Sequence, residues 1–260
     1  MKIFCDALET FVEIPEHVER IVSLAPSITE TLAMLGLEKR IVGIDTYSRN
    51  IVDAPVICDS FLEIDRCIDR IREIEPDLVL GVGGAQLASA KKLVHRVPIY
   101  IVPLPRSVYG VLELVEIVAH LCGADPSKLL NDMMNTLTRL GNSLPQLRTV
   151  AILAFSPNEI VVAGRGTHVY SALRHLGLVI AISALSYQRI DKVPRDLDLA
   201  IIDVEPNLDP HTIAKIIDLD MDRIPTLILR NEIKMHGPRF VLQTLPKIVE
   251  NIKKLVEAHR

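Results

Sequence analysis

The stretch from residue 107 to residue 123 (SVYGVLELVEIVAHLCG) is apolar on nearly every side at the spacing of an α-helix. Glu113, Glu116 and His120 leave only a narrow polar ridge, so other parts of the protein must cover the helix on most sides. At 1.5 Å per residue it would be about 25 Å long. We interpret it as a spine between two lobes; the alternative is a buried helix within one large domain.

Strand-like and helix-like segments alternate on both sides of this spine, which predicts an α/β fold with mainly parallel sheets flanked by helices. The expected domains are an α/β lobe over 1–104, the spine over 105–124 and a similar lobe over 125–260. Expected strands cover 20–25, 41–44, 78–82, 98–102, 149–155, 160–163, 197–203 and 225–230; expected helices cover 27–35, 64–74, 86–94, 128–140, 167–176, 210–217 and 240–258.

The two halves also repeat one another weakly. RIVSLAPS (20–27) parallels TVAILAFSP (149–157), and EPDLVLGVGG (75–84) parallels DLDLAIIDVEP (196–206). Each pair joins a buried strand to a turn, which favours two similar lobes. Pro246 lies inside the last helical stretch and predicts a kink or a restart there.

Composition excludes several classes of function. The net charge of −4 and the lack of a Lys/Arg block argue against nucleic-acid binding. No apolar run reaches the length of a membrane-spanning helix. The N-terminus lacks the apolar core of a signal peptide, so we expect a cytoplasmic protein as the sequence is written, or an extracytoplasmic one if a leader has been removed. The four cysteines are expected to be free and buried, with a Cys58–Cys67 bridge as the alternative.

At this point the chain resembles the helical-backbone periplasmic binding proteins, which include the vitamin B12-binding and ferric-siderophore-binding proteins of ABC importers. The resemblance covers nearly the whole chain in order. It rests on the spine and on four further segments: 6–48, which opens DALETFVEIPE; 68–84 (IDRIREIEPDLVLGVGG); 148–177, which contains VVAGRGTHVYSALRHLG; and 236–248 (HGPRFVLQTLPKI).

The resemblance implies a solute-binding protein for a metal chelate (a corrinoid, haem or a ferric siderophore) bound in a cleft between the lobes. It implies no intrinsic cofactor and no catalysis, and we expect a monomer with an ABC permease as its candidate partner. The alternative is a cytoplasmic chelate-binding or chelatase-like protein with the same two-lobed fold. The chain departs from the B12-binding members in having no tryptophan.

Aromatic residues near the ends of expected strands are the first candidate ligand contacts. By resemblance to the B12-binding protein, Tyr47 matches a tyrosine that contacts ligand, and Phe61 lies close to a tryptophan position. Phe155 matches an aromatic residue of the second lobe, and Tyr187 falls in its other aromatic loop. Core packing is the alternative for the two phenylalanines, whereas a tyrosine hydroxyl needs a polar partner when it is buried.

Polar residues and glycine turns complete the expected ligand site. Pro26 and Ser27 follow the first strand, although Ser27 with Glu30 also forms the S-x-x-E pattern of a helix N-cap. Gly83-Gly84 and the 164–167 segment (GRGT) lack a nucleotide-binding pattern, so turn geometry is their expected role. Four further residues could bind an anionic chelate through a positive charge or a hydrogen bond: Arg165, Arg230, Asn231 and His236. The alternative is that they are solvated surface residues.

Two acidic residues are expected to contact a transporter. The B12-binding protein docks through paired glutamates, and the matching positions here are Asp69 and Asp191. His168 and His175 lie seven residues apart on one expected helix, but they are interpreted as ordinary histidines because no cluster shows metal-ligand spacing. We therefore expect no metal bound directly by the protein.

Overall fold

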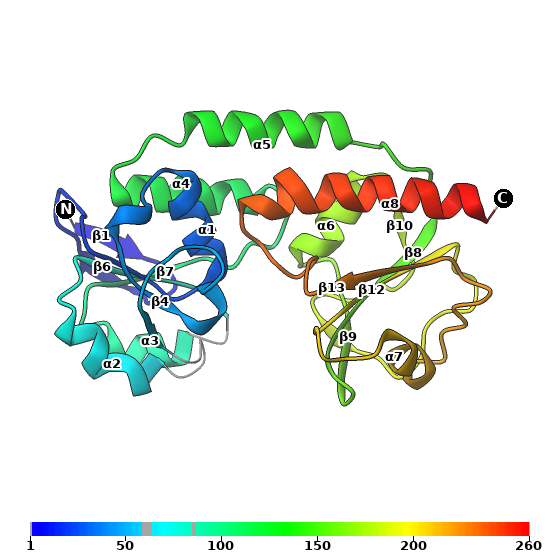
Figure 1. Cartoon of the computed structure of the whole chain (residues 1–260), viewed down its shortest axis with the longest axis horizontal. Helices are drawn as coiled ribbons and strands as arrows, with labels where there is room; N and C mark the ends of the chain where they lie inside the picture. The colour runs from blue at the N-terminus through cyan, green and yellow to red at the C-terminus, as the bar shows by residue number, and fades with distance from the viewer. Residues whose placement is uncertain (1, 59–63, 85–86, 260) are drawn as a thin grey trace. The chain divides into compact units, whose positions relative to one another are not determined.

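A computed structural model describes residues 2–58, 64–84 and 87–259 of the chain (Figure 1). The chain divides into two compact units. Unit 1 comprises residues 1–104 and 112–131, and unit 2 comprises residues 105–111 and 132–260. Each unit has an α/β fold, as the alternation of segments predicts, and each is described by itself below.

Unit 1 contains a parallel sheet of five strands in the order β5-β4-β3-β6-β7. Its central strands are entirely apolar or nearly so, as parallel strands covered on both faces must be. The sheet strands are β3 (Ile21–Ser23), β4 (Ile41–Asp45), β5 (Val56–Cys58), β6 (Leu78–Val82) and β7 (Ile99–Val102), and the helical segments are α1 (Pro26–Met34), η1 (Glu38–Arg40), η2 (Thr46–Ser48), α2 (Ile64–Glu73) and α3 (Leu87–Leu93).

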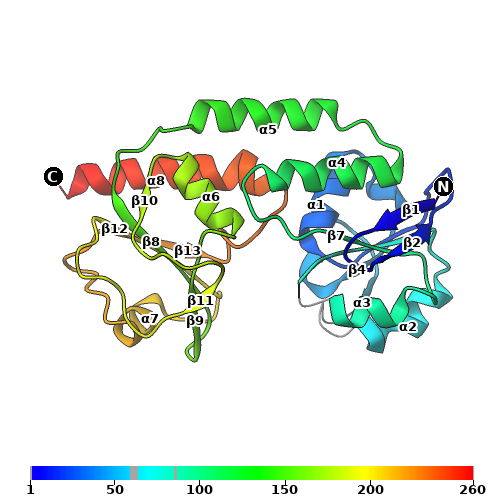
Figure 2. The same ribbon diagram turned by 180° about the vertical axis from the view of Figure 1, so that it is seen from behind.

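An antiparallel hairpin that the sequence patterns did not predict opens unit 1. Strands β1 (Lys2–Cys5) and β2 (Thr10–Glu13) pair with Phe4 opposite Phe11 (Figure 2). Cys5 and Val12 are buried, whereas the two phenylalanines point outward in an edge-to-face pair with ring centroids 5.2 Å apart. Each strand is only four residues long, which is too short for its alternation to stand out in the sequence.

Unit 2 contains a mixed sheet of six strands, in which β8, β12 and β13 are parallel neighbours. Strand β9 joins the other edge of β8 in the antiparallel sense, because it returns from a hairpin. The strands are β8 (Arg148–Ser156), β9 (Glu159–Val162), β10 (Val179–Ile180), β11 (Gln188–Arg189), β12 (Leu199–Val204) and β13 (Thr226–Arg230), and the helical segments are α6 (His168–His175), α7 (Pro210–Ile216), the π-helix η3 (Phe240–Thr244) and α8 (Leu245–Ala258).

The predicted spine forms helix α4 (Gly110–Cys122), and α5 (Ser127–Leu140) follows it; both helices contribute residues to both units. As its pattern requires, α4 is buried on most sides, and Glu113, Glu116 and His120 are exposed. The helix is three residues shorter at its start than the apolar pattern suggests, because the Ser107 hydroxyl accepts the N–H of Gly110 at 2.9 Å and holds a turn there.

The end of α4 follows the expected glycine signal. Gly123 has a φ of 64°, and its N–H donates to the His120 carbonyl at 3.3 Å. The next N–H, that of Ala124, donates to the Ala119 carbonyl at 2.9 Å. These two bonds form a Schellman motif, which requires the left-handed conformation that glycine adopts without strain.

The internal repeat corresponds to equivalent places in the two sheets. The repeated segments form the adjacent parallel pairs β3–β6 and β8–β12. In unit 1 the Asp77 carboxylate accepts the N–H of Arg20 at 2.9 Å, and in unit 2 the Asp198 carboxylate accepts the N–H of Arg148 at 2.7 Å. The acidic residue at the start of one strand therefore fixes the start of its neighbour in both units.

The C-terminal stretch restarts at Pro246, as predicted. A π-helical segment ends at Thr244, and α8 begins at Leu245 with Pro246 in its first turn. Proline lacks the N–H that a helix interior needs, but the first turn has no use for it. No helix in the described ranges is long and apolar enough to cross a lipid bilayer.

Candidate functional site

Tyr47 lies on the turn η2, immediately after β4 of unit 1, and 68% of its surface is exposed. Asp45, at the end of β4, is fully buried beneath this turn. The hydroxyl of Ser48 donates to Asp45 Oδ1, and the backbone amides of Tyr47 and Ser48 also favour the carboxylate. Burial outweighs these bonds and raises the pKa of Asp45. The exposed ring therefore stands on a buried local anchor.

Hydroxyl groups extend this anchor into the sheet. Thr29 Oγ1 of α1 donates to Ser48 Oγ at 2.9 Å and lies 2.8 Å from Ser23 Oγ of β3. All of these side chains are buried. A chain of hydrogen bonds thus joins β3, α1 and the end of β4, and it gives the turn that carries Tyr47 a defined position.

Ser27 does not cap helix α1, which corrects the S-x-x-E interpretation. The N-cap is Ala25, and no side chain accepts a bond there, because the helix begins at Pro26. Proline suits this place since the first helical N–H has no intrahelical partner. Ser27 Oγ is buried without a hydrogen-bond partner among the described residues. The hydroxyl can therefore form a hydrogen bond with a ligand or with water.

Gly83 and Gly84 follow β6 in the same unit. A side chain at Gly83 would approach the backbone nitrogen of Leu104 to 3.3 Å, and Gly84 has a φ of 112°. The glycine pair therefore serves close backbone approach and turn geometry, as expected. Phe61, the fourth predicted aromatic contact, lies outside the described residues.

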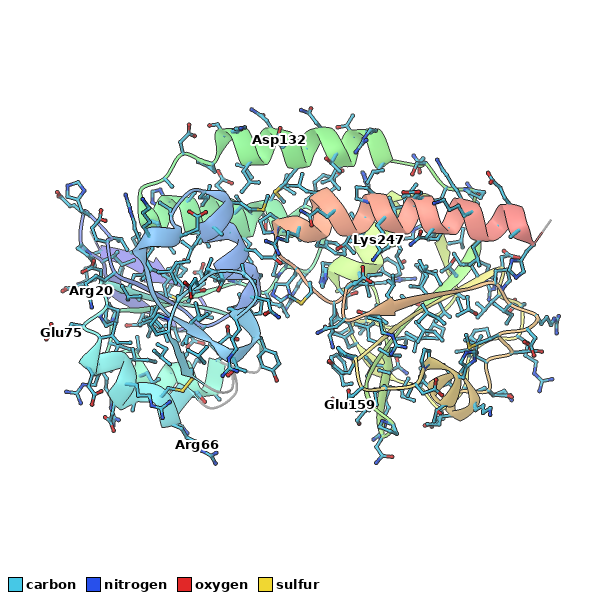
Figure 3. All side chains as sticks on the ribbon, viewed as in Figure 1. Arg20, Arg66, Glu75, Asp132, Glu159 and Lys247 are labelled. Carbon is cyan, nitrogen blue, oxygen red and sulfur yellow. A yellow bond between two sulfur atoms is a disulfide. The ribbon has the colours of Figure 1, made fainter. Side chains whose placement is uncertain are left out.

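Cys58 and Cys67 form a disulfide that connects the end of β5 with α2, visible as a yellow bond in Figure 3. The sequence left this bridge as the less favoured alternative. The carbonyl of Cys58 also accepts a hydrogen bond from Thr46 Oγ1 at 3.3 Å, which links the bridge to the turn that carries Tyr47. Cys5 and Cys122 are free and buried, as expected, and burial raises the pKa of Cys122 to about 12.

Three neighbouring strands of unit 2 share one register row near their carboxyl ends: β12 and β13 end at it, and β8 ends two residues beyond it. Val204 of β12 pairs with Ala154 of β8 on one side and with Arg230 of β13 on the other. The residues one step further along these strands are therefore neighbours at the carboxyl edge of the sheet, where ligands of open α/β sheets bind. They are Phe155, Glu205 and Asn231.

Lys234 occupies the centre of this edge, and the sequence analysis did not identify it. Its Nζ lies 4.6 Å from the centroid of the Phe155 ring and pairs with Glu205. Phe155 is 40% exposed, so core packing is the wrong interpretation for this residue. Glu205 at the end of the apolar strand was the available signal for a buried cation nearby, because a carboxylate there needs a partner.

Asn231 and Arg230 belong to the same edge. Asn231 has a φ of 57°, and its N–H donates to the Val204 carbonyl at 3.0 Å. Its Oδ1 is buried without a partner among the described residues. Arg230 instead turns to the Leu208 carbonyl, to which it donates at 2.7 Å, so part of its hydrogen-bonding capacity is already used within unit 2.

His236, which is partly buried, lies beside the buried His168 of α6. The ring centroids lie 5.7 Å apart, and the His168 ring also packs edge-to-face on Phe240 at 5.0 Å. Burial, with a contribution from His236, lowers the pKa of His168 to about 3, and burial also lowers the pKa of His236. Both rings are therefore neutral at pH 7. His236 Nε2 is buried and has no partner among the described residues.

Arg165 and Tyr187 form a separate set in unit 2. The N–H groups of Gly164 and Gly166 donate to the carbonyls of Ser186 and Leu185, at 3.0 Å and 2.8 Å. A side chain at Gly164 would come within 2.4 Å of the Ser186 carbonyl oxygen. The segment is a turn, as expected, since the Thr167 N–H donates to the Gly164 carbonyl at 3.1 Å. Neither Gly164 nor Gly166 has a positive φ, so close backbone approach explains the glycines around Arg165.

The side chains of Arg165 and Tyr187 remain accessible. Arg165 is exposed, and Tyr187 is 38% exposed. Desolvation raises the pKa of the Tyr187 hydroxyl to about 12, so it stays neutral and can donate a hydrogen bond. Both residues are consequently available to a ligand from the surface of unit 2.

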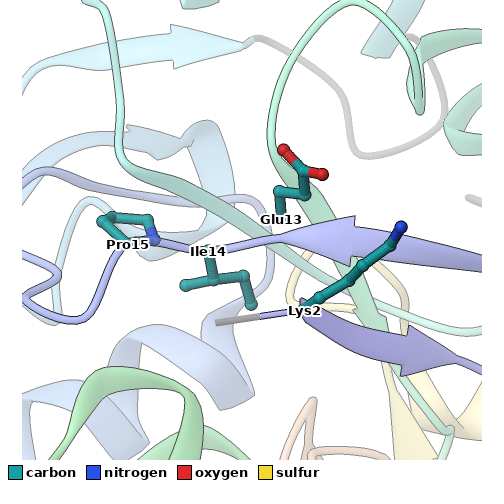
Figure 4. A pocket seen from close by; sticks show the side chains of 4 residues that line it. All are labelled: Lys2, Glu13, Ile14 and Pro15. Carbon is teal, nitrogen blue, oxygen red and sulfur yellow. The ribbon is translucent and has the colours of Figure 1, made fainter.

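Asp69 on α2 and Asp191 after β11 are both exposed, as a docking role would require. Across the parts of the chain that the structure describes, no group of three or more potential metal-ligating side chains gathers. A hollow of about 460 Å³ lies beside the N-terminal hairpin and is lined by Lys2, Glu13, Ile14 and Pro15 (Figure 4). None of the predicted ligand contacts lines it.

The two α/β units, with α4 and α5 contributing to both, have the fold expected from the resemblance to helical-backbone binding proteins. The family model described as "Periplasmic binding protein" matches residues 21–196, more than half of the chain. The chain therefore belongs to the periplasmic binding protein family.

Individual relatives are distant. An uncharacterised ABC transporter substrate-binding lipoprotein of Bacillus subtilis strain 168, YvrC, is 23% identical over 97% of this chain and 83% of its own. The haem-binding protein RhuT from Roseiflexus sp. RS-1 superimposes with a TM-score of 0.71 at 19% identity, covering 94% of this chain and all of its own. The petrobactin-binding protein YclQ from Bacillus subtilis gives 0.72 at 12%, covering 99% and 98%.

Proposed function

We propose that this protein binds a metal chelate of the haem or ferric-siderophore class and delivers it to an ABC permease. Membership of the family supports a small-molecule ligand and a permease partner, and it favours this function over a chelatase-like one. The similar structures of haem-binding and petrobactin-binding proteins support the ligand class. Corrinoids, which the B12-binding resemblance implies, belong in the same ligand panel.

The observation that carries the proposal is the exposure of three aromatic rings at or beside strand ends, of which Tyr47 stands on the buried Asp45 anchor. Tyr47, Phe155 and Tyr187 expose 68%, 40% and 38% of their surface. Flat rings give contact area to a macrocycle or a catecholate with little loss of conformational entropy. An exposed ring held on a buried anchor is prepared for binding, since little ordering remains to be done when the ligand arrives.

The remaining predicted contacts supply polar groups. Ser27 Oγ, Asn231 Oδ1 and His236 Nε2 are buried without partners among the described residues. Polar groups of this kind orient a ligand when it satisfies them, because leaving them unsatisfied carries a penalty. Pro26, Gly83, Gly84, Arg165 and Arg230 complete the proposed set, with Phe61.

We further propose that the protein acts outside the cytoplasm and that Asp69 and Asp191 contact the permease. The Cys58–Cys67 disulfide supports an oxidising compartment, where such bonds form and persist. The similarity to a substrate-binding lipoprotein points the same way. Exposed acids at the rim of an interface chiefly set encounter rate and register, so charge reversal at Asp69 should slow transport in reconstituted vesicles without changing ligand affinity.

The test of ligand binding pairs affinity with stability. Haem, ferric catecholate and hydroxamate siderophores, cobinamide and cobalamin are titrated and followed by absorbance or calorimetry. With the best of these ligands, Tyr47→Ala and Phe155→Ala should each weaken binding by about 2 kcal/mol, roughly thirtyfold. Their free energy of unfolding should change little, because neither ring is buried in the core.

Phe11→Ala is the matched control for Phe155→Ala. Phe11 is 57% exposed and has the Nζ of Lys2 5.4 Å from its ring centroid, as Phe155 has Lys234. It lies on the hairpin of unit 1, away from the strand ends. Unchanged affinity in Phe11→Ala is expected; unchanged affinity in both Tyr47→Ala and Phe155→Ala would refute the proposed contacts.

A further inference from the structure

Asp203 is a buried carboxylate with an unusual set of partners. It lies on β12, pairs with Leu229 of β13 in the sheet register, and is only 2% exposed. Its carboxylate oxygens accept the backbone N–H groups of Glu232, Ile233 and Lys234, at 3.0, 3.0 and 3.3 Å. Three successive amides converging on one carboxylate form an anion-binding nest closed by a side chain of the same unit.

These bonds fix the loop after β13. Asn231 enters it in the left-handed conformation, which turns the following amides inward. The Ile233 carbonyl lies 3.2 Å from His168 Nε2, and the Glu232 carboxylate accepts from Lys247 Nζ at 2.7 Å. Lys247 is labelled on α8 in Figure 3. The loop that presents Lys234 is thus tied to β12, to α6 and to α8 of unit 2.

The position of Lys234 follows from this attachment. Its side chain is only 18% exposed, although its Nζ lies over the partly exposed ring of Phe155 and beside Glu205. A lysine is a flexible chain that normally keeps its ammonium in water. Held here, the ammonium places a positive charge next to an aromatic surface, where an anionic group of a stacked ligand would meet it.

We infer that Asp203 is a positioning residue that holds Lys234 in place to recognise an anionic group of the ligand stacked on Phe155. This inference rests on the proposed function. It adds the chemistry of the ligand at the unit 2 contacts, which is a chelate with a flat surface and a carboxylate or catecholate charge. Asp203 itself does not touch the ligand. Its effect on affinity passes through Lys234, and this dependence can be measured.

The experiment compares ligands that differ in charge. Haem carries two carboxylates, and its dimethyl ester has the same ring without them; a trianionic ferric tris-catecholate and a neutral ferric tris-hydroxamate form the second pair. Wild type should bind the anionic member of the pair more tightly. Lys234→Met should lower affinity for that member by about tenfold, the contribution of a hydrogen bond to a charged group, and leave the neutral member unchanged.

Asp203→Asn presents an NH₂ group to backbone donors and should release the loop. It should lose the preference for the charged ligand to the same extent as Lys234→Met. The double variant should bind the charged ligand at most about twofold more weakly than Lys234→Met, because Asp203 acts through Lys234. Asp198→Asn is the matched control. Its carboxylate also accepts a backbone N–H, from Arg148 at the start of the β8–β12 pair, so the substitution should lower stability while keeping the discrimination.

The outcomes separate this inference from the proposed function. If no member of either pair binds wild type, the proposed function fails and this inference fails with it. If the chelates bind but wild type and Lys234→Met treat the charged and neutral members alike, only the inference fails. It is also overturned if Asp203→Asn, shown by circular dichroism to be folded, retains full discrimination while Lys234→Met loses it.

Discussion

Both units place a buried aspartate near the carboxyl end of a parallel strand, but the two carboxylates hold different kinds of structure. Asp45 of unit 1 accepts a hydrogen bond from the Ser48 hydroxyl and is favoured by the backbone amides of its own residue, Tyr47 and Ser48. Asp203 of unit 2 binds amides 29 to 31 residues further along the chain. One anchor shapes a local turn, whereas the other joins two strand ends across a long stretch of sequence.

This difference shows how the same residue type can prepare a surface in two ways. In unit 1 the anchored turn exposes an aromatic ring, Tyr47. In unit 2 the anchored loop brings a cation, Lys234, to the aromatic ring of a neighbouring strand. Burial raises the pKa of both aspartates, which shows that burying each carboxylate costs free energy. The hydrogen bonds that position the turn and the loop offset this cost.

The largest expected difference between the two aspartates is in the stability that is lost when each is replaced by alanine. Asp203→Ala leaves three backbone N–H groups without their acceptor, and each buried unsatisfied donor costs about 1–3 kcal/mol, so we expect a loss of about 3 kcal/mol or more. Asp45→Ala should cost only about 1 kcal/mol, because the turn that it holds carries the exposed Tyr47, and the amides of this turn can bond water instead. Urea unfolding measures both. An equal or larger loss in Asp45→Ala would contradict the distinction between local and long-range anchors.

Reduction of the disulfide should affect unit 1 alone. All four cysteines, at positions 5, 58, 67 and 122, belong to that unit. The bridge spans a sequence separation of 9, and a constraint of this length on the unfolded chain is worth about 2–3 kcal/mol. In hydrogen exchange with a dithiol reductant, peptides from β5 and α2 should exchange faster, while peptides from β12 and β13 keep their rates.

The variant with Cys58→Ser and Cys67→Ser is the control for this experiment. It should show the fast exchange already, without reductant, and should not respond when the dithiol is added. Faster exchange in unit 2 on reduction would mean that the two units do not respond independently.

The sequence predicted the fold because long apolar periods were present. The strand over 78–82 coincides with β6, and the helix over 128–140 is α5 with one more residue. Within the site, the local anchor was accessible in principle, since Asp45 and Ser48 flank Tyr47 in a turn pattern. The long-range anchor could not be predicted, because no local pattern around Asp203 indicates that the loop after β13 contacts it.

The exposed aromatic residues were found through resemblance and strand ends, whereas the failures have local physical causes. Ser27 matched a capping pattern, but Pro26 starts the helix one residue earlier. Lys234 lies in a polar loop and gave no periodic signal. The lysine meets Glu205 and Phe155 because β8, β12 and β13 share a register row near their carboxyl ends, and that arrangement follows from the topology of the sheet.

Lowering the pH should reduce the free energy of unfolding through His168 of unit 2, by less than the two changes above. His168 of unit 2 is neutral in the folded state because burial lowers its pKa to about 3, while its unfolded pKa is 6.5. The unfolded chain therefore binds the extra proton first as the pH falls. Stability that is fully present above pH 6.5 is lost between 6.5 and about 3, at about 1.4 kcal/mol per pH unit. At pH 5 the loss due to this residue is about 2 kcal/mol.

His168→Gln keeps a donor for the Ile233 carbonyl and removes the titrating group. Urea unfolding between pH 7.5 and pH 5 should show a shallower pH dependence than wild type, by one proton. His211→Gln, at an exposed position of the same unit, should leave the dependence unchanged. The raised pKa values of Asp45 and Asp203 act in the opposite sense, since their protonated forms favour the folded state. They are common to wild type and variant, so they cancel in the difference. Identical slopes for wild type and His168→Gln would mean that His168 is not held neutral in unit 2.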